Sequence, residues 1–304
     1  AADTANVITA DDSDAIAYAK KVTVTGSNAV TLTITGTILL QKNTTLVITG
    51  GGTVLRKIDS TLFDIEDTCT LNLNGITVTG DGKSFQYPVA QTTADDKVSN
   101  IILNNTTIKN MTVSGKSRGI ITIFANNNKG SRCNLTITDS VFENCSTTAG
   151  GALQFQINTQ STVTISNVTF NNCSATTGAT MLFQNNTRCD VTINDSTFNG
   201  NSATTGAAMY FQGNTHCAVV VNNTMFSNNK TSQGGVVRTA GSSGISLRLN
   251  QCVFKNNTAQ DSLFGSSYTN GAAIYWNACG SDLNGNRSHA TIVDCQFLSN
   301  KVIF

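Results

Sequence analysis

The chain has 304 residues, of which 12% are charged, and its 19 lysines and arginines nearly balance its 18 aspartates and glutamates. This charged share is about half that of an average soluble protein, and it excludes the clustered basic surface of a nucleic-acid or anionic-membrane binding protein. No apolar run approaches the roughly 18 residues that a membrane-spanning helix requires, so direct membrane insertion is not expected.

The N-terminal segment, residues 1–24, is predicted to cap the fold. Residues 11–21 begin with acidic side chains and end with two lysines, which is the charge order that a helix dipole favours. We therefore expect a short capping helix there. Ala1 and Ala2 are typical of what remains after signal-peptide cleavage. Together with the neutral, hydroxyl-rich composition, they favour an extracellular or cell-surface location.

Residues 25–133 contain short runs in which apolar and polar residues alternate, such as residues 31–36, 45–50, 70–80 and 100–110. Alternation of this kind is the signature of a half-buried β-strand. The spacing between the runs varies. This region is therefore predicted to form irregular rungs, a rung being one turn of a stacked coil.

Residues 134–304 repeat with a strict period. A phenylalanine recurs at one constant interval (170 − 142 = 28) and once more after a longer one (297 − 254 = 43), at Phe142, Phe170, Phe198, Phe226, Phe254 and Phe297. A fixed period with short alternating strands indicates a solenoid whose turns bury one another. Crossovers between parallel strands are right-handed by default. The predicted fold is therefore all-β, a single-stranded right-handed parallel β-helix that forms one domain.

Two further positions recur in each repeat. Glycine precedes the second strand, where a positive φ or a close neighbouring rung excludes a Cβ, at Gly150, Gly178, Gly206, Gly234 and Gly271. Asparagine or cysteine follows each phenylalanine by three positions, at Cys145, Cys173, Asn201, Asn229, Asn257 and Asn300. Because neighbouring rungs lie about 4.8 Å apart, these amides are predicted to bond from rung to rung as an Asn ladder.

Three segments break the period, at residues 81–98, 257–270 and 277–289. Long loops on a rigid scaffold are the usual place for binding sites, although tolerated insertion explains each segment equally well. The candidate ligand-binding residues are aromatic residues of these segments together with the neighbouring tryptophan: Phe85, Tyr87, Phe264, Tyr268 and Trp276.

A phenylalanine, two further positions and an asparagine, linked to a Gly-Gly-Ala before an apolar strand, resembles the repeat of the polymorphic outer membrane proteins, first associated with chlamydial surface proteins. Residues 142–152 and 226–235 carry this pattern, with Cys145 in the asparagine position of the first. The resemblance covers roughly residues 100–304. It implies a right-handed β-helix displayed at a cell surface and acting in adhesion, and it transfers no catalytic residue.

The nine cysteines fall into columns set by the phenylalanines. Cys189 and Cys217 are one rung apart, as are Cys252 and Cys295, which places their Cα atoms within disulfide range. For Cys189 with Cys217, a bridge and two free thiols are equally compatible with the sequence. The third pair, at positions 145 and 173, favours small buried thiols. With two histidines and no CxxC motif, neither a metal site nor a cofactor is expected.

Parallel β-helices also host polysaccharide lyases and hydrolases, which need clustered carboxylates. The best candidates are Asp139, Asp195 and Asp294, each three positions before a phenylalanine. Asparagine or glutamine fills the intervening rungs, so a turn role is favoured over a catalytic one. The mixed charges of residues 56–67 are interpreted as a solvated edge. We therefore expect no catalytic residue.

Three functions remain open. The first is a non-catalytic scaffold that binds a host or neighbouring-cell surface protein or glycan in adhesion. The second is a structural subunit that assembles end to end into an extracellular filament, with Val302, Ile303 and Phe304 forming the apolar assembly end. The third is a polysaccharide lyase or hydrolase. Asn-X-Ser/Thr sequences such as those at Asn43 and Asn134 make the chain a candidate glycoprotein.

Overall fold

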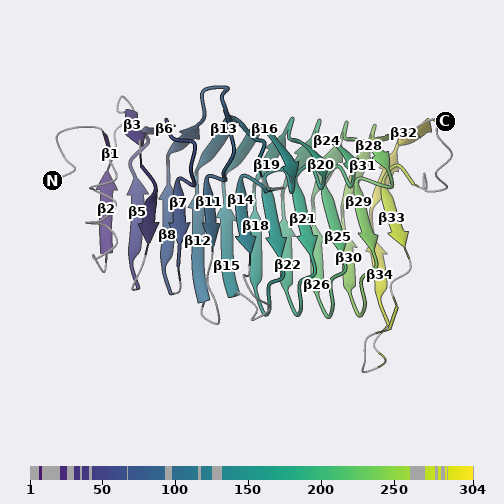
Figure 1. Cartoon of the computed structure of the whole chain (residues 1–304). Coiled ribbons are helices and arrows are strands. Elements are labelled where there is room, and N and C mark those ends of the chain that lie inside the picture. The colour runs from purple at the N-terminus through teal and green to yellow at the C-terminus, as the bar shows by residue number, and fades with distance from the viewer. Residues whose placement is uncertain are drawn as a thin grey trace.

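The computed structural model describes residues 7–8, 21–25, 31–34, 36–40, 43–66, 68–92, 98–115, 118–124, 132–260, 271–277, 280–281, 285 and 287–303. Within these residues every regular element is a β-strand. The strands pair in parallel and stack into three sheets that run along one axis (Figure 1). The predicted fold, a single parallel β-helix, is confirmed.

Two of the sheets contribute one strand to a rung. The ten-stranded sheet consists of β2 (Lys21–Thr25), β5 (Thr45–Thr49), β8 (Thr70–Asn74), β12 (Val98–Asn104), β15 (Arg132–Thr138), β18 (Thr162–Ser166), β22 (Asp190–Asn194), β26 (Ala218–Asn222), β30 (Ser246–Asn250) and β34 (His289–Val293). The nine-stranded sheet consists of β4 (Ile38–Leu40), β7 (Phe63–Ile65), β11 (Ala90–Thr92), β14 (Ile121–Phe124), β17 (Leu153–Gln156), β21 (Met181–Gln184), β25 (Met209–Gln212), β29 (Val237–Ala240) and β33 (Ile274–Asn277).

The third sheet has seventeen strands, because most later rungs contribute two short strands on either side of an Asn or Cys. These strands are β1 (Val7–Ile8), β3 (Thr31–Ile34), β6 (Thr53–Arg56), β9 (Thr77–Thr79), β10 (Ser84–Phe85), β13 (Thr107–Val113), β16 (Val141–Ala149), β19 (Thr169–Asn171), β20 (Ser174–Thr177), β23 (Thr197–Asn199), β24 (Ser202–Thr205), β27 (Met225–Ser227), β28 (Lys230–Gln233), β31 (Val253–Lys255), β32 (Thr258–Gln260), β35 (Gln296–Leu298) and β36 (Lys301–Ile303).

The strand register shows the length of each rung. From Leu135 the partners Val163, Val191, Val219 and Leu247 follow at a constant interval (163 − 135 = 28). The next step, from β30 to β34, is longer (289 − 246 = 43). Earlier steps vary, and they include a short one between β5 and β8 (70 − 45 = 25) and a longer one between β12 and β15 (134 − 100 = 34). Rung length therefore varies before residue 134 and is constant from β15 to β30.

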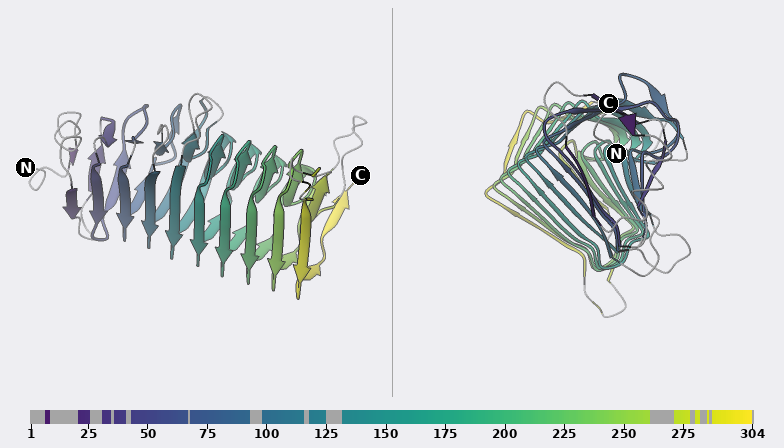
Figure 2. Two further views of the ribbon diagram at one scale, coloured as in Figure 1. Left: turned by 90° about the horizontal axis from the view of Figure 1, so that it is seen from below. Right: turned by 90° about the vertical axis from the view of Figure 1, so that its left-hand side faces the viewer.

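Stacked phenylalanines fill the interior. The rings at positions 142, 170, 198, 226, 254 and 297 lie one above another, with centroids 4.6 to 5.1 Å apart. A second stack, at Phe155, Phe183 and Phe211 on the nine-stranded sheet, has centroids 4.9 Å apart. The view along the axis shows successive rungs superimposed around this core (Figure 2). Each ring is therefore shielded from water by the rings of the neighbouring rungs. A single repeat could not bury its own ring, so the repeats must stack to be stable.

The turns between strands follow the predicted residue pattern. Gly150, Gly178, Gly206, Gly234 and Gly271 all have positive φ. At Gly151 a Cβ would lie 1.4 Å from the carbonyl oxygen of Ala179, so only glycine fits against the next rung. The predicted Asn ladder is present, and it runs from Asn201 to Asn300 through amide hydrogen bonds of 2.9 to 3.1 Å.

Two sequence predictions concern the N-terminal half of the chain: the capping helix and the excursion at residues 81–98. Residues 9–20, which carry most of the predicted capping helix, lie outside the described residues, and Lys21 begins strand β2, which pairs with β5. The prediction that residues 81–98 leave the coil is wrong for much of their length. Ser84–Phe85 pairs with β13, and Ala90–Thr92 pairs with β7 and β14.

Candidate functional site

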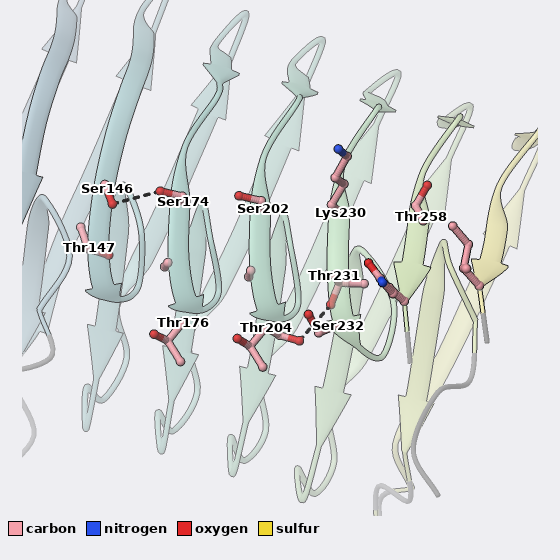
Figure 3. A pocket seen from close by; sticks show the side chains of 14 residues that line it. Ser146, Thr147, Ser174, Thr176, Ser202, Thr204, Lys230, Thr231, Ser232 and Thr258 are labelled. Carbon is pink, nitrogen blue, oxygen red and sulfur yellow. Dashed lines mark hydrogen bonds between the residues drawn. The ribbon is translucent and has the colours of Figure 1, made fainter. Parts of the chain in front are cut away.

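A groove runs along the second strands of the seventeen-stranded sheet, and we call it the hydroxyl groove (Figure 3). It encloses about 600 Å³ and crosses rungs from β16 to β36. Its lining consists of Ser146, Thr147, Ser174, Ala175, Thr176, Ser202, Ala203, Thr204, Lys230, Thr231, Ser232, Thr258, Gln260 and Ile303. Most of these side chains are small and carry a hydroxyl, so the groove is open and polar.

The strand register arranges this lining into three columns parallel to the axis. One column contains Ser174, Ser202 and Lys230, and the next contains Ala175, Ala203 and Thr231. Ala203 and Thr231 are buried and form part of the floor, whereas Thr204 on the third column is exposed. Small residues in the middle column leave the space that larger side chains would fill.

Hydrogen bonds between rungs orient several of the hydroxyls. Ser174 Oγ donates to Ser146 Oγ at 3.0 Å, and Thr231 Oγ1 lies 3.2 Å from the backbone oxygen of Thr204. A hydroxyl that donates to its neighbour still has lone pairs to accept a bond from a ligand. The groove therefore offers a row of positioned acceptors and donors at the rung spacing of about 4.8 Å.

Lys230 is the charged residue of the lining, and its side chain is exposed. No carboxylate or histidine lines the groove in the described residues. Acid-base catalysis of glycosidic cleavage needs a pair of carboxyl groups flanking the bond. The chemistry that this lining supports is therefore binding through hydrogen bonds and one positive charge.

Of the aromatic residues predicted to bind ligand, the three that the structure describes do not line this groove. Phe85 is only 5% exposed and packs under the guanidinium of Arg56, 4.0 Å from the ring centroid. Its predicted role as a surface binding residue is therefore wrong. Tyr87 and Trp276 are half-buried, and Trp276 packs against the core. The candidates Phe264 and Tyr268 lie outside the described residues.

The candidate carboxylates occupy turns, as expected. Asp139, Asp195 and Asp294 each have a φ of 50°, a left-handed conformation that Asp and Asn tolerate best among residues with a Cβ. The side-chain nitrogen of Asn167 donates to Asp139 Oδ1 at 2.7 Å, and the next pair repeats the bond at the same distance. Asp139 and Asp195 are therefore paired with the amides of the rungs that follow them rather than gathered at one site.

The mixed-charge segment at residues 56–67 is not a uniformly solvated edge, and Arg56 departs furthest from that prediction. Lys57 and Asp59 are exposed, but Arg56 is fully buried. Its guanidinium donates to the backbone oxygens of Ile58, Ser60 and Tyr87 at 3.1, 2.6 and 2.8 Å. Burial, partly offset by the charge of Asp59, lowers the pKa of Arg56 to about 10. Arg56 therefore ties two rungs together and is not part of a solvated edge.

The cysteine pairs lie in adjacent rungs as predicted, and the structure contains them as free thiols. The backbone N–H of Cys189 donates to Cys217 Sγ at 3.4 Å, and that of Cys252 donates to Cys295 Sγ at the same distance. Hydrogen bonding to Cys217, together with burial, raises the pKa of the Cys189 thiol. Burial raises the pKa of Cys252 to about 11. In this structure the thiols act as acceptors at turns, and the proposed bridges are not formed.

A second Asn ladder was not anticipated. Asn158, Asn186 and Asn214 are buried at the turn that follows the nine-stranded sheet. Asn158 Nδ2 donates to Asn186 Oδ1 at 3.1 Å, and Asn186 repeats the bond to Asn214 at 3.0 Å. These residues recur at the same interval as the phenylalanines (186 − 158 = 28). Aligning the sequence at the repeat interval would therefore have revealed these asparagines. It would also have revealed the serine column of the hydroxyl groove.

At the C-terminal end, Val302 is half-buried and Ile303 is 46% exposed on β36. Phe304 lies outside the described residues. Their role in assembly remains a prediction.

No family model matches the chain, and no curated protein matches it. Among the described residues, no helix has the length and apolar character to cross a membrane. The same residues contain no group of three or more His, Cys, Asp or Glu side chains placed to hold a metal ion.

Proposed function

We propose that the protein is a secreted or cell-surface scaffold without catalytic activity that binds an extended partner chain in adhesion. The observation that carries this proposal is the hydroxyl groove, which follows the axis across several rungs and is lined mainly by small hydroxyl side chains. A long shallow groove suits a linear protein segment or glycan better than a compact small molecule, which binds in enclosed apolar pockets.

The rigidity of the coil supports this role. Neighbouring rungs are joined by parallel backbone pairing on three sheets, and ladders of buried amides add to this from residue 158 onward, so the groove is formed before the ligand arrives. A preorganised site loses little conformational entropy on binding. The resemblance of the Phe-Asn and Gly-Gly-Ala repeat to surface proteins that act in adhesion favours the same role.

Microspheres coated with the full chain test the proposal on a panel of immobilised glycans and extracellular proteins. We expect retention on at least one surface. Thr204→Trp, which places a large ring in the groove, should lower retention at least tenfold. Thr192→Trp is the matched control, because Thr192 is an outward position of β22 on the ten-stranded sheet, and it should retain full binding.

Two outcomes would count against the proposal. Absence of binding on every surface, or equal retention by both tryptophan variants, would remove the groove as the binding site. Release of reducing ends from a polysaccharide by the purified chain would instead support the lyase or hydrolase alternative.

A further inference from the structure

A second polar cleft lies on the nine-stranded sheet and shares no residue with the hydroxyl groove. It consists of two adjoining cavities, of about 370 and 450 Å³, which both include Arg118 in their lining. We call it the amide cleft, because it is lined by Asp64, Gln91, Arg118, Gln154, Gln156 and Gln184. Three further hydroxyls, of Thr37, Ser60 and Thr61, line the end near Asp64.

The register places these side chains on successive rungs. Asp64 pairs with Gln91, Gln91 with Thr122, and Thr122 with Gln154, while Gln156 pairs with Gln184. The strands that carry Asp64 and Gln184 are four rungs apart, which corresponds to about 19 Å at the spacing of parallel strands. The cleft is therefore long enough for a short linear ligand that lies along the axis.

Two opposite charges face the first cavity. Asp64 Oδ2 accepts a hydrogen bond from Gln91 Nε2 at 3.3 Å, but Oδ1 is shielded from solvent and has no partner. Arg118 interacts electrostatically with Asp64, and its guanidinium lies 5.3 Å from the ring centroid of Phe124. Desolvation by burial raises the pKa of Asp64 and lowers that of Arg118. The first cavity therefore presents one carboxylate as a hydrogen-bond acceptor and one guanidinium as a donor.

The second cavity presents ordered side-chain amides. Gln154 Oε1 accepts the backbone N–H of Gly119 at 3.0 Å, and Gln154 Nε2 donates to Gln156 Oε1 at 3.4 Å. Gln184 Nε2 donates to Gln212 Oε1 at 3.3 Å. Each amide carries two N–H donors and an oxygen with two lone pairs, so the row retains donors and acceptors for a ligand.

These features identify the chemistry of the ligand. Sugar hydroxyls donate and accept at once, so one unit can bond both a carboxylate acceptor and a guanidinium donor. The half-buried faces of Tyr87 and Phe124 border the two cavities and provide apolar surface for a pyranose ring. One carboxylate and one guanidinium leave no net charge in the lining, which disfavours a polyanion. The pyranose repeat of a linear β-linked glycan is also close to the rung spacing of about 4.8 Å.

We propose that the amide cleft binds a neutral linear oligosaccharide of about four units, with Asp64 and Arg118 holding hydroxyls in the first cavity and the glutamine row holding those in the second. The amide cleft is separate from the hydroxyl groove, so the proposal for one site can fail while the proposal for the other stands.

Isothermal titration of the full chain tests the proposal, with neutral β-1,4-linked oligosaccharides of glucose, xylose and mannose as probes. At least one series should bind, with affinity rising from the disaccharide to the tetrasaccharide and then levelling off. Asp64→Asn and Arg118→Met should each weaken tetrasaccharide binding at least tenfold. Thr192→Trp, at an outward position of the ten-stranded sheet and away from both clefts, should leave it unchanged.

Gln184→Ala, at the other end of the cleft, should weaken the tetrasaccharide more than the disaccharide, and this comparison does not depend on whether the Asp64 variant folds. The proposal is overturned if no neutral series binds, or if binding survives both Asp64→Asn and Arg118→Met in folded protein. Tighter binding of polygalacturonate or of an extended peptide, lost in the same variants, would also overturn it by assigning the cleft to another ligand class.

Discussion

Asn201 and Asn229 lie one rung apart, and Oδ1 of Asn229 accepts both the backbone N–H of Asn201 at 3.0 Å and its side-chain Nδ2 at 3.1 Å. Asn201 Nδ2 also donates to the backbone oxygen of Phe170 at 3.0 Å. Both asparagines are fully buried. The side chain of Asn229 therefore supplies the hydrogen-bond acceptor for buried N–H groups at the turn of the preceding rung. The coil depends on the repetition of these bonds along the ladder.

Removing one ladder amide should destabilise the coil strongly. Asn229→Ala leaves the buried Asn201 N–H without its acceptor, so we expect the free energy of unfolding to fall by about 1–3 kcal/mol. Asn229→Ser should lose less, because a serine hydroxyl serves the same purpose where the N–H of Asn214 donates to Ser242 Oγ at 3.2 Å. Urea unfolding followed by circular dichroism measures both. Equal losses in the two variants would contradict the assigned role.

The phenylalanine stack allows a comparison within one column. Phe198 is fully buried between two other rings, whereas Phe297, in the last rung of the stack, is 47% exposed. Phe198→Ala should cost about 3–5 kcal/mol through lost burial and the cavity left behind. Phe297→Ala should cost less than half as much under the same conditions. Similar unfolding midpoints for the two variants would show that stacking does not carry the core.

Alanine substitutions at two glycines with positive φ distinguish the cost of steric crowding from the cost of backbone strain. A Cβ on Gly151 would meet the carbonyl oxygen of Ala179 at 1.4 Å, whereas a Cβ on Gly241 would have nothing within 4 Å. Gly241→Ala should therefore cost about 1 kcal/mol, which is the lower end of the strain expected for an unfavourable φ. Gly151→Ala should cost several times more, or prevent folding, when thermal unfolding is compared. Equal effects would mean that the rungs can separate there.

The repeat made much of this fold predictable. A fixed interval between Phe142, Phe170 and Phe198 reports the strand register directly, because equal residues stack when each rung has equal length. The left-handed turns at Asp139 and Asp195 followed from the same alignment. Before residue 134 the rung length varies, so no alignment of equivalent positions was possible and the strand pairing of Ser84–Phe85 was missed.

The candidate sites were much less predictable, because the repeat interval gives the strand register but does not show where the surface forms a groove. The Ser174 and Ser202 column was visible at the interval of the repeat, but only the bend of the backbone makes it one side of a groove. Arg56 looked like a surface charge, since its three carbonyl acceptors come from irregular turns. Asp64 and Arg118 are far apart in the chain and belong to rungs of unequal length, so no spacing rule could bring them together.

The buried thiol of Cys133 should make stability depend on pH in the alkaline range. Burial raises its pKa from the ordinary value of 9.0 to about 12. Below pH 9 both the folded and the unfolded states keep the proton, and the full stability is present. Above pH 9 the unfolded chain loses the proton while the folded chain retains it, so the free energy of unfolding falls by up to about 1.4 kcal/mol per pH unit until about pH 12.

Cys133→Ala removes this titration. We expect its unfolding free energy to decline less steeply than that of the wild type between pH 9 and 11, with a constant difference between the two at pH 7 and 8. Cys133→Ser also lacks a thiol, so it should share the shallower slope even if its stability at pH 7 differs. Urea unfolding at each pH gives the slopes. Parallel curves for wild type and both variants would show that this thiol titrates alike in the folded and unfolded chain.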